Sequence, residues 1–408
     1  RIKTRMNSSS FSLFGSYFLL FYIVPALGLM MFYDDYLDLY NINGNLWPLL
    51  VIPVLILTIY IIHTLLPKIT ISERFLTSIL YNDKVLFVFS LIFLVSALFF
   101  FQNYSMSFRH RESMSEAGGV VILMFGLRAL FKVIILYYLF KKLSGEEVNN
   151  FKKTILGLVI VSYAISINSS LDVIFIFVSF VIILNKTHLF LQSGTISSVK
   201  IITVGLLAAF VVASIAFLGI ANKIGTDSAL TLFSNGDTLK FVSVHILKRL
   251  STHFISIITA GENYYRDINI ISELIEFQFN NLINRFYILF GKSEAIRSDI
   301  WSVNRLNYLR LFIDTDNPKT GSSPGIIASV FYLPNLYLGL LIIAIFTVTI
   351  FRKFDALLKE IKGYKLNFIG NFILIFFMLP ILDSPLDLIN VLSPSFIYLF
   401  FFLFLPTK

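Results

Sequence analysis

The chain of 408 residues contains no cysteine. This absence excludes a disulfide framework, a thiolate metal site and a catalytic thiol. Charged residues are also scarce: they make up 14% of the chain, whereas hydrophobic residues make up 57%. This ratio is too apolar for a soluble domain and is typical of a polytopic membrane protein. The 44 phenylalanines agree with that class, because lipid-facing surfaces tolerate large apolar side chains.

Several sequence motifs are missing as well. There is no P-loop and no G-x-G-x-x-G, so nothing predicts nucleotide-driven chemistry, and H-E-x-x-H does not occur either. The net charge is +9, but the basic residues are not massed on one soluble stretch, which argues against a nucleic-acid partner. An enzyme without these motifs needs a donor that is already activated and held in the membrane.

The apolar residues fall into ten runs that approach the ~20 residues needed to span a bilayer. These runs are Phe11–Phe32, Trp47–Leu66, Val85–Phe101, Gly119–Phe140, Thr154–Ile167, Leu171–Leu184, Ile201–Ile220, Ala328–Phe351, Leu366–Leu382 and Leu386–Leu405. Loops rich in Lys and Arg favour the cytoplasm, which predicts that both ends of the given sequence are cytoplasmic. The sequence begins with Arg1 instead of Met, which leaves open whether another segment precedes it.

The predicted fold class is all-α: a polytopic transmembrane helical bundle of about ten spans with one long extracytoplasmic loop domain of amphipathic helices. Residues 1–220 would form the N-terminal transmembrane helices and residues 328–408 the C-terminal ones. Residues 221–327 would form the outer catalytic or binding domain, because they make up the one long part of the chain that is too polar to lie in lipid.

Three arginines stand out in or near the first spans. Arg109 and Arg111 lie in a short loop that is predicted to face outward, against the usual bias of positive charge toward the cytoplasm. Three interpretations are open. The two arginines bind an anionic ligand, Glu112 and Glu116 neutralise their charge, or the topology is inverted in this loop. Arg128 lies within a predicted span, where a charge usually faces the protein interior or a wet cavity.

The outer segment begins with a helical pattern over Leu239–Ala260. His245, Arg249 and His253 recur every four residues, so they form one stripe on this helix. One interpretation is an interfacial helix whose cations meet lipid phosphates. The other is a functional face on which Arg249 binds a phosphate or diphosphate and a histidine carries a proton. His253 is the first candidate for the proton acceptor and Glu262 the second.

The same histidines give little support to a metal site. His245 and His253 are two helical turns apart, and no Asp or Glu lies on their stripe. We therefore predict no metal and no other cofactor.

A second amphipathic helix is predicted over Ile271–Phe290, with Arg285 near its end. Arg285 either caps the helix dipole or binds a ligand. Arg305 and Arg310 follow with Tyr308 between them, an arrangement that suits stacking on sugar rings beside anionic groups and equally suits an ordinary folded loop.

The sequence Gly321-Ser322-Ser323-Pro324-Gly325 returns the chain to an apolar run. Ser323 is a good N-cap and Pro324 a good first-turn residue, so we expect a helix whose positive end points into the outer cavity. Exposed N–H groups there bind phosphate, and Ser322 and Ser323 are predicted ligand contacts. Gly321 would allow close approach of the backbone.

These features resemble those of the O-antigen and capsule polymerases of the Wzy type, which are related in architecture to O-antigen ligases and to the membrane glycosyltransferases called GT-C. The resemblance is carried by the long outer loop, by Arg249 in the run 248–253 (Lys-Arg-Leu-Ser-Thr-His), and by residues 320–329. The turn 168–170 (Asn-Ser-Ser) lacks an arginine that many relatives have. Ser323-Pro324 stands where ligases usually show a His-Asn pair, which favours a polymerase and leaves the catalytic base open.

The resemblance implies an enzyme of the bacterial cytoplasmic (inner) membrane with its active site on the periplasmic or extracellular side. It would transfer a glycan block from undecaprenyl diphosphate to the terminal sugar of a lipid-linked repeat unit, without metal or nucleotide. The implied partners are undecaprenyl diphosphate-linked oligosaccharide, membrane lipid, a chain-length regulator and a flippase. The alternatives are an O-antigen ligase or another lipid-linked sugar transferase, and a flippase or transporter of lipid-linked oligosaccharide.

Overall fold

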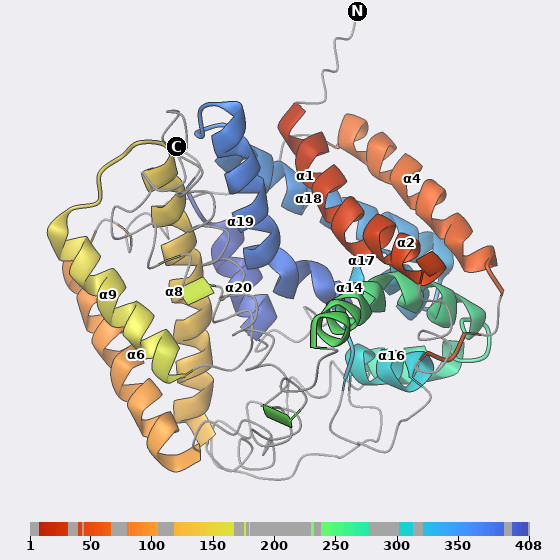
Figure 1. Cartoon of the computed structure of the whole chain (residues 1–408), viewed down its shortest axis with the longest axis horizontal. Helices are drawn as coiled ribbons and strands as arrows, with labels where there is room; N and C mark the ends of the chain where they lie inside the picture. Colours follow the sequence, from red (N-terminus) through yellow and green to blue (C-terminus); the bar gives the residue numbers. More distant parts are fainter. Residues whose placement is uncertain are drawn as a thin grey trace, which may run out of the picture.

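A computed structural model describes most of the chain, and its described residues form helices joined by short turns (Figure 1). The described residues are 8–31, 40–42, 45–66, 80, 82–104, 118–166, 175–176, 179, 230–231, 238–276, 302–312, 321–386 and 394–406. Within these ranges there is no β-strand, only an isolated bridge between Tyr40 and Phe312. The predicted all-α class is therefore confirmed.

Six of the described helices are long and apolar enough to cross a membrane, which makes the chain a multi-pass membrane protein by length and composition. They are Leu13–Met31, Trp47–Leu65, Asp83–Gln102, Leu123–Leu143, Leu336–Leu358 and Leu366–Asp383. Each of these coincides with one of the ten predicted runs.

The first span is built from three joined elements, α1 (Ser8–Phe18), the π-helix η1 (Leu19–Ile23) and α2 (Val24–Met31). A π-helical turn inside an α-helix rotates the residues that follow it, and such turns are frequent at functional sites. Here the turn places Phe21 and Tyr22 in the protein interior.

A second span, formed by η2 (Trp47–Leu50) and α4 (Val51–Leu65), packs against α18 (Leu336–Leu358). Arg352 of α18 donates to the carbonyl oxygens of His63 and Leu66, at 2.6 and 2.9 Å, and so caps the carboxyl end of α4. Because Arg352 also lies near the carboxyl end of α18, the two helices run parallel. Both were predicted to run from the outer side inward.

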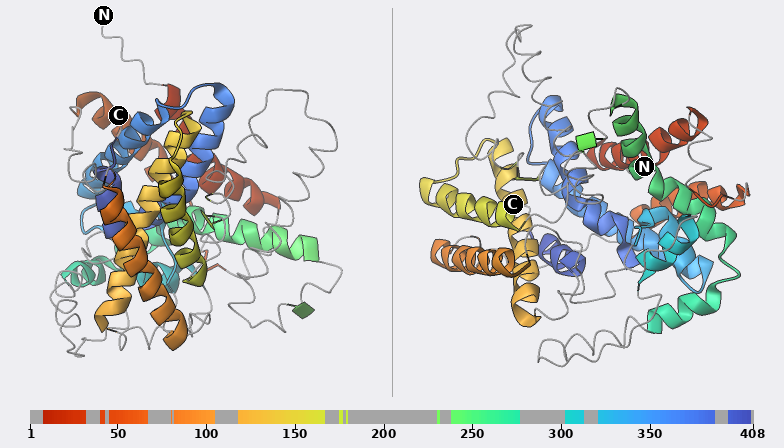
Figure 2. Two further views of the ribbon diagram at one scale, coloured as in Figure 1. Left: turned by 90° about the vertical axis from the view of Figure 1, so that its left-hand side faces the viewer. Right: turned by 60° about the horizontal axis from the view of Figure 1, so that its bottom comes forward.

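The helices α6 (Asp83–Tyr104), α8 (Gly118–Leu143) and α9 (Asn150–Ile165) form a second group, drawn in orange and yellow in Figures 1 and 2. Ion pairs join the ends of these helices that were predicted to be cytoplasmic. Lys152 lies 3.5 Å from Asp83, and Lys141 lies 3.6 Å from Glu360, just beyond α18. These ends therefore lie together, as the predicted topology requires.

Four predicted spans are not among these six helices: two correspond to shorter helices, and two lie wholly or mostly outside the described residues. Helix α9 corresponds to the run Thr154–Ile167 but has only 16 residues, and α20 (Pro394–Leu403) covers 10 residues of the run Leu386–Leu405. The run Leu171–Leu184 is described only at residues 175–176 and 179, and the run Ile201–Ile220 lies outside the described residues.

The predicted span Ala328–Phe351 is interrupted near its start. A short helix α17 (Gly325–Ala328) and a 3₁₀ turn η3 (Ser329–Tyr332) come first, and α18 begins only at Leu336. The interruption follows from Pro334, because a proline disfavours the helical conformation in the residue before it, and Leu333 is extended. The side chain of Asn335 then caps α18 by accepting from the Leu338 N–H at 3.0 Å. We call residues 321–332 the α17 segment.

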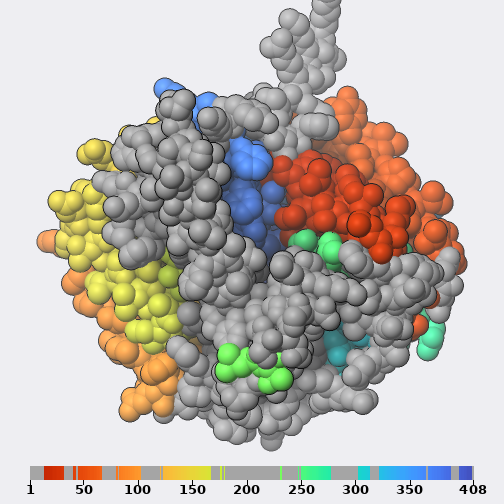
Figure 3. Space-filling view, in the orientation of Figure 1, coloured from red at the N-terminus to blue at the C-terminus, as the bar shows by residue number. Residues whose placement is uncertain are grey.

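Helix α14 (Thr238–Glu262) confirms the predicted helix over Leu239–Ala260. It packs against α2, η1, α16 (Val303–Leu311) and α17, and in the left view of Figure 2 it runs across the direction of α8 and α9. Helix α19 (Tyr364–Asp383) lies beside α1, and on the face shown in Figure 3 the two are neighbours with α14 below them. The polar centre described next lies where α14, α17 and α19 meet, beside the first span.

The contact between α18 and η3 gives the first prediction. A Cβ atom at Gly339 would lie 2.7 Å from the carbonyl oxygen of Val330, which is backbone and cannot rotate away. Gly339→Ala should therefore destabilise the protein by about 1–3 kcal/mol, as overpacking does. Thermal unfolding of the detergent-purified protein measures this effect.

Gly157→Ala is the matched control. Gly157 lies inside α9, and a Cβ atom there meets nothing within 4 Å, so alanine should raise the unfolding temperature through its higher helix propensity. Equal effects of the two substitutions would contradict the close approach of α18 to η3.

Candidate functional site

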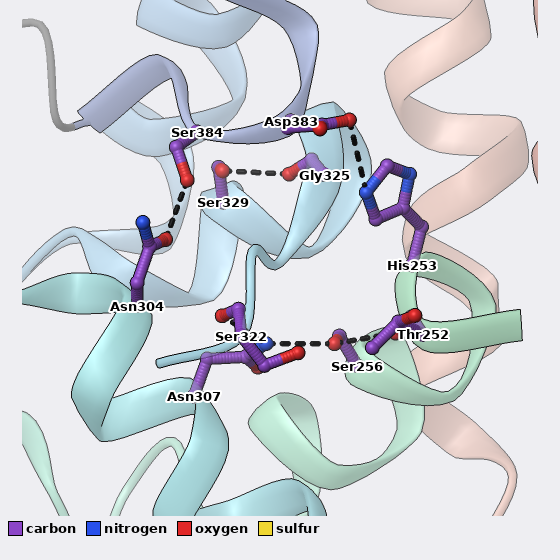
Figure 4. A network of polar contacts seen from close by, with 10 residues as sticks. All are labelled: Thr252, His253, Ser256, Asn304, Asn307, Ser322, Gly325, Ser329, Asp383 and Ser384. Atoms are coloured by element: carbon purple, nitrogen blue, oxygen red, sulfur yellow. Dashed lines mark hydrogen bonds and ion pairs between the residues drawn. The ribbon is translucent and has the colours of Figure 1, made fainter. Parts of the chain in front are cut away.

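The candidate site is centred on a buried contact between His253 of α14 and Asp383 at the carboxyl end of α19. The imidazole Nε2 lies 3.2 Å from the carboxylate Oδ1, and the two side chains point toward one another (Figure 4). The His253 residue is 6% exposed, whereas the Asp383 side chain is 26% exposed. An acidic and a basic group that meet in a largely apolar interior form an uncommon arrangement, because burial of charge is costly unless it is paired.

Two further residues fix the position of the imidazole. The ring of Phe21, from the π-helical turn, lies 5.1 Å from the imidazole centre. Gly325 lies against the other atoms of the ring: a Cβ there would stand 2.8 Å from Cγ of His253. Gly325 also has φ +75°, so both its conformation and the space around it require glycine. The start of α17 is thus pressed against His253.

This geometry distinguishes the two imidazole nitrogens. A carboxylate beside Nε2 favours the tautomer that carries its hydrogen on Nε2, which leaves Nδ1 as the proton acceptor. Nδ1 is buried and has no hydrogen-bond partner among the described residues. A histidine held in this way has the features of a general base that is oriented by a carboxylate.

The side chain of Asn307 connects the elements around this pair. Its amide nitrogen donates to the hydroxyl of Ser256 and to the carbonyl of Ser322, both at 2.9 Å, and its oxygen accepts from the hydroxyl of Tyr332 at 2.7 Å. The Ser256 hydroxyl in turn donates to the carbonyl of Thr252 at 2.6 Å (Figure 4). Helices α14 and α16 and the α17 segment are therefore held in one arrangement.

A buried ion pair lies next to this network. Arg310 contacts one oxygen of Asp267 through Nε and Nη2, each at 2.8 Å, and its guanidinium lies 4.7 Å from the ring centre of Tyr332. Burial raises the pKa of the Tyr332 hydroxyl, and the neighbouring Arg310 charge opposes that shift. Tyr332 is therefore neutral at physiological pH and can donate to Asn307.

Several predicted ligand contacts already have protein partners. Arg128 is buried and donates through Nη1 to the carbonyl and hydroxyl of Ser166, at the carboxyl end of α9. Arg310 pairs with Asp267, and Arg305 is buried with its guanidinium 5.3 Å from the Tyr308 ring. Ligand binding by these three arginines stays a prediction, because these contacts account for their burial without a ligand.

The second candidate base, Glu262, is not brought together with His253. Its Oε1 accepts from the Asn45 N–H at 3.0 Å, and it lies nine residues further along α14, about 13 Å by helical rise. The two side chains are too far apart to serve the same substrate hydroxyl.

The prediction that Ser323 caps a helix is wrong. The helix begins at Gly325, and the residue before it, Pro324, makes no side-chain cap. The positive φ of Gly325 turns the backbone at the point where a capped helix would start.

Gly321 does allow a close backbone approach, but its neighbour is Asn304. Ser322 uses its backbone N–H to bond the Asn304 carbonyl at 2.8 Å.

The other predicted contacts lie outside what the structure describes. Arg109, Arg111 and Arg285 are in undescribed ranges. His245 and Arg249 lie on α14 at the predicted four-residue spacing from His253, but their side chains are not described.

Asp383 is the residue that the sequence interpretation missed. It follows the apolar run of α19 directly, so a carboxylate at the end of a span was the available signal. The sequence does not reveal that α14, 130 residues earlier, crosses this end. Among the described residues, no group of three His, Asp or Glu side chains is placed to hold a metal ion.

Comparisons of the chain with protein-family models, with curated proteins and with solved structures find no match.

The buried ion pair gives the second prediction. Arg310→Met should destabilise the protein by about 3–5 kcal/mol, because it leaves the Asp267 carboxylate buried without its partner. The double variant Arg310→Met with Asp267→Leu should recover most of this loss, since both charges are then absent. Unfolding temperatures of the two variants provide the measurement, and a double variant less stable than Arg310→Met would refute the role of pairing.

Proposed function

We propose that this protein is a polysaccharide polymerase of the cytoplasmic membrane of a bacterium. It would transfer a glycan block from undecaprenyl diphosphate to the terminal sugar of a lipid-linked repeat unit on the outer face. The observation that carries the proposal is the buried contact between His253 of α14 and Asp383 at the end of α19 in a multi-pass membrane protein. The resemblance of residues 248–253 and 320–329 to Wzy-type polymerases supports the same reaction.

The chemistry requires a proton acceptor and a stabiliser of negative charge. The bond between the anomeric carbon and the diphosphate oxygen breaks as the acceptor sugar oxygen forms the new glycosidic bond. The acceptor hydroxyl gives its proton to Nδ1 of His253, and Asp383 stabilises the imidazolium that forms. The leaving group is undecaprenyl diphosphate, whose growing negative charge would be stabilised by Arg249 and other arginines of the outer segment.

The position of the contact along the spans supports this assignment. Asp383 is at the end of α19 remote from Tyr364, whereas the ion pairs of Lys141 and Lys152 lie at the end predicted to be cytoplasmic. A base on the opposite side from the basic ends is suited to substrates that have already been moved across the membrane.

The third prediction tests this function in cells that lack the gene. Surface polysaccharide separated on a gel should collapse from a ladder to single repeat units, and the wild-type gene should restore the ladder. His253→Gln and Asp383→Asn should fail to restore it, because removal of a general base or its orienting group typically slows a reaction by about 10²–10⁴-fold. Arg249→Ala should fail as well if Arg249 stabilises the leaving group.

His63→Gln is the matched control, because His63 lies near the opposite end of the bundle, where Arg352 caps α4. This variant should restore the ladder. Loss of all surface units on deletion would point to a ligase or a flippase, and accumulation of repeat units only on the inner face would point to a transporter. A ladder unchanged by deletion would refute the polysaccharide function.

A further inference from the structure

Two buried tyrosines, Tyr17 of α1 and Tyr22 of η1, lie next to the His253–Asp383 pair. Each is 2% exposed, and neither hydroxyl has a hydrogen-bond partner among the described residues. Their rings are 6.0 Å apart, and Phe21, which contacts His253, lies between them in the sequence. The first span therefore brings two unpaired phenol hydroxyls to the candidate site.

These hydroxyls face polar groups of two other elements. Both interact electrostatically with the Asp383 carboxylate at the end of α19. The two hydroxyls face each other, and the Tyr17 hydroxyl also faces the backbone N–H of Ile326 in the α17 segment, while the Tyr22 hydroxyl faces that of Ile327. Asp383 Oδ1 is buried, and its neighbour is Nε2 of His253, at 3.2 Å. Three buried polar groups without a hydrogen bond in the described residues, the two phenol hydroxyls and Nδ1 of His253, thus lie around the His253–Asp383 pair.

Packing does not explain these hydroxyls. A buried polar group without a partner lowers stability, and phenylalanine would fill the same volume without that cost. The chain uses phenylalanine at 44 positions, and both Phe18 and Phe21 belong to this same stretch. Unsatisfied buried polar groups in native proteins call for an explanation, and catalysis is one of the accepted ones.

We propose that Tyr17 and Tyr22 are positioning residues for the His253–Asp383 pair. When the acceptor sugar is bound, their hydroxyls donate hydrogen bonds to the Asp383 carboxylate and hold it against Nε2 of His253. Nδ1 then takes the proton of the acceptor hydroxyl, while the hydrogen on Nε2 stays in place. This assignment rests on the proposed polymerase function and names the groups that orient its base.

The test uses Tyr17→Phe, Tyr22→Phe and the double variant, with Tyr398→Phe as the matched control. The Tyr398 hydroxyl is also buried without a described partner, but it belongs to α20 and lies near Lys132. Unfolding temperature and polymer formation are measured for each variant. All four should unfold at the wild-type temperature or above, because each loses only an unpaired hydroxyl.

Polymer formation should separate the variants. The double variant should make polymer about 10- to 100-fold more slowly, the loss typical when a group that orients a metal-binding histidine is removed, while Tyr398→Phe should match the wild type. Loss of polymer together with a lower unfolding temperature would show a structural role and overturn the proposal. Normal polymer from the double variant, with no polymer from His253→Gln, would overturn only the tyrosine assignment. A ladder unchanged by gene deletion would refute the polymerase function and this proposal with it.

Discussion

The geometry of the candidate site depends on the amide of Asn307. This side chain is fully buried and makes three hydrogen bonds, to Ser256, Ser322 and Tyr332. Hydrogen bonds are stronger in an apolar interior than in water, and an unpaired amide there is correspondingly costly, so the three elements are held in one relative position. Because the α17 segment is fixed to α14 in this way, Gly325 stays against the ring of His253.

Paired and unpaired polar groups therefore have different roles in this interior. The pairs Arg310–Asp267 and Arg128–Ser166 join separate elements of the chain, and each uses a charge that would otherwise be costly to bury. Buried side-chain atoms without a hydrogen bond occur at several places in the described chain, and the hydroxyls of Tyr17 and Tyr22 and Nδ1 of His253 are those at the candidate site. A membrane interior offers little water to satisfy such groups, so those at the candidate site call for a partner, which the proposed substrate would supply.

Six of the ten predicted spans and the predicted helix α14 are present in the structure, because apolar length and four-residue spacing are local properties. The sequence also singled out His253. It did not predict Asp383 as the partner, since that contact depends on how α14 crosses α19. The same limit applies to Arg128 and Arg310: the sequence shows that a buried arginine needs a partner, but it does not show that Ser166 and Asp267 supply one. The break at Leu333 follows from Pro334, which is a local feature of the sequence and could be predicted from it.

The place of Asp383 at the carboxyl end of α19 adds a further electrostatic argument. The unpaired carbonyl groups at that end carry partial negative charge, which disfavours a carboxylate and favours a cation in front of it. A carboxylate held there is stabilised when a positive charge forms beside it, and the proposed proton transfer to His253 would create that charge 3.2 Å away. The arrangement therefore stabilises the state after proton transfer more than the resting state, which is the property required of a group that assists a catalytic base.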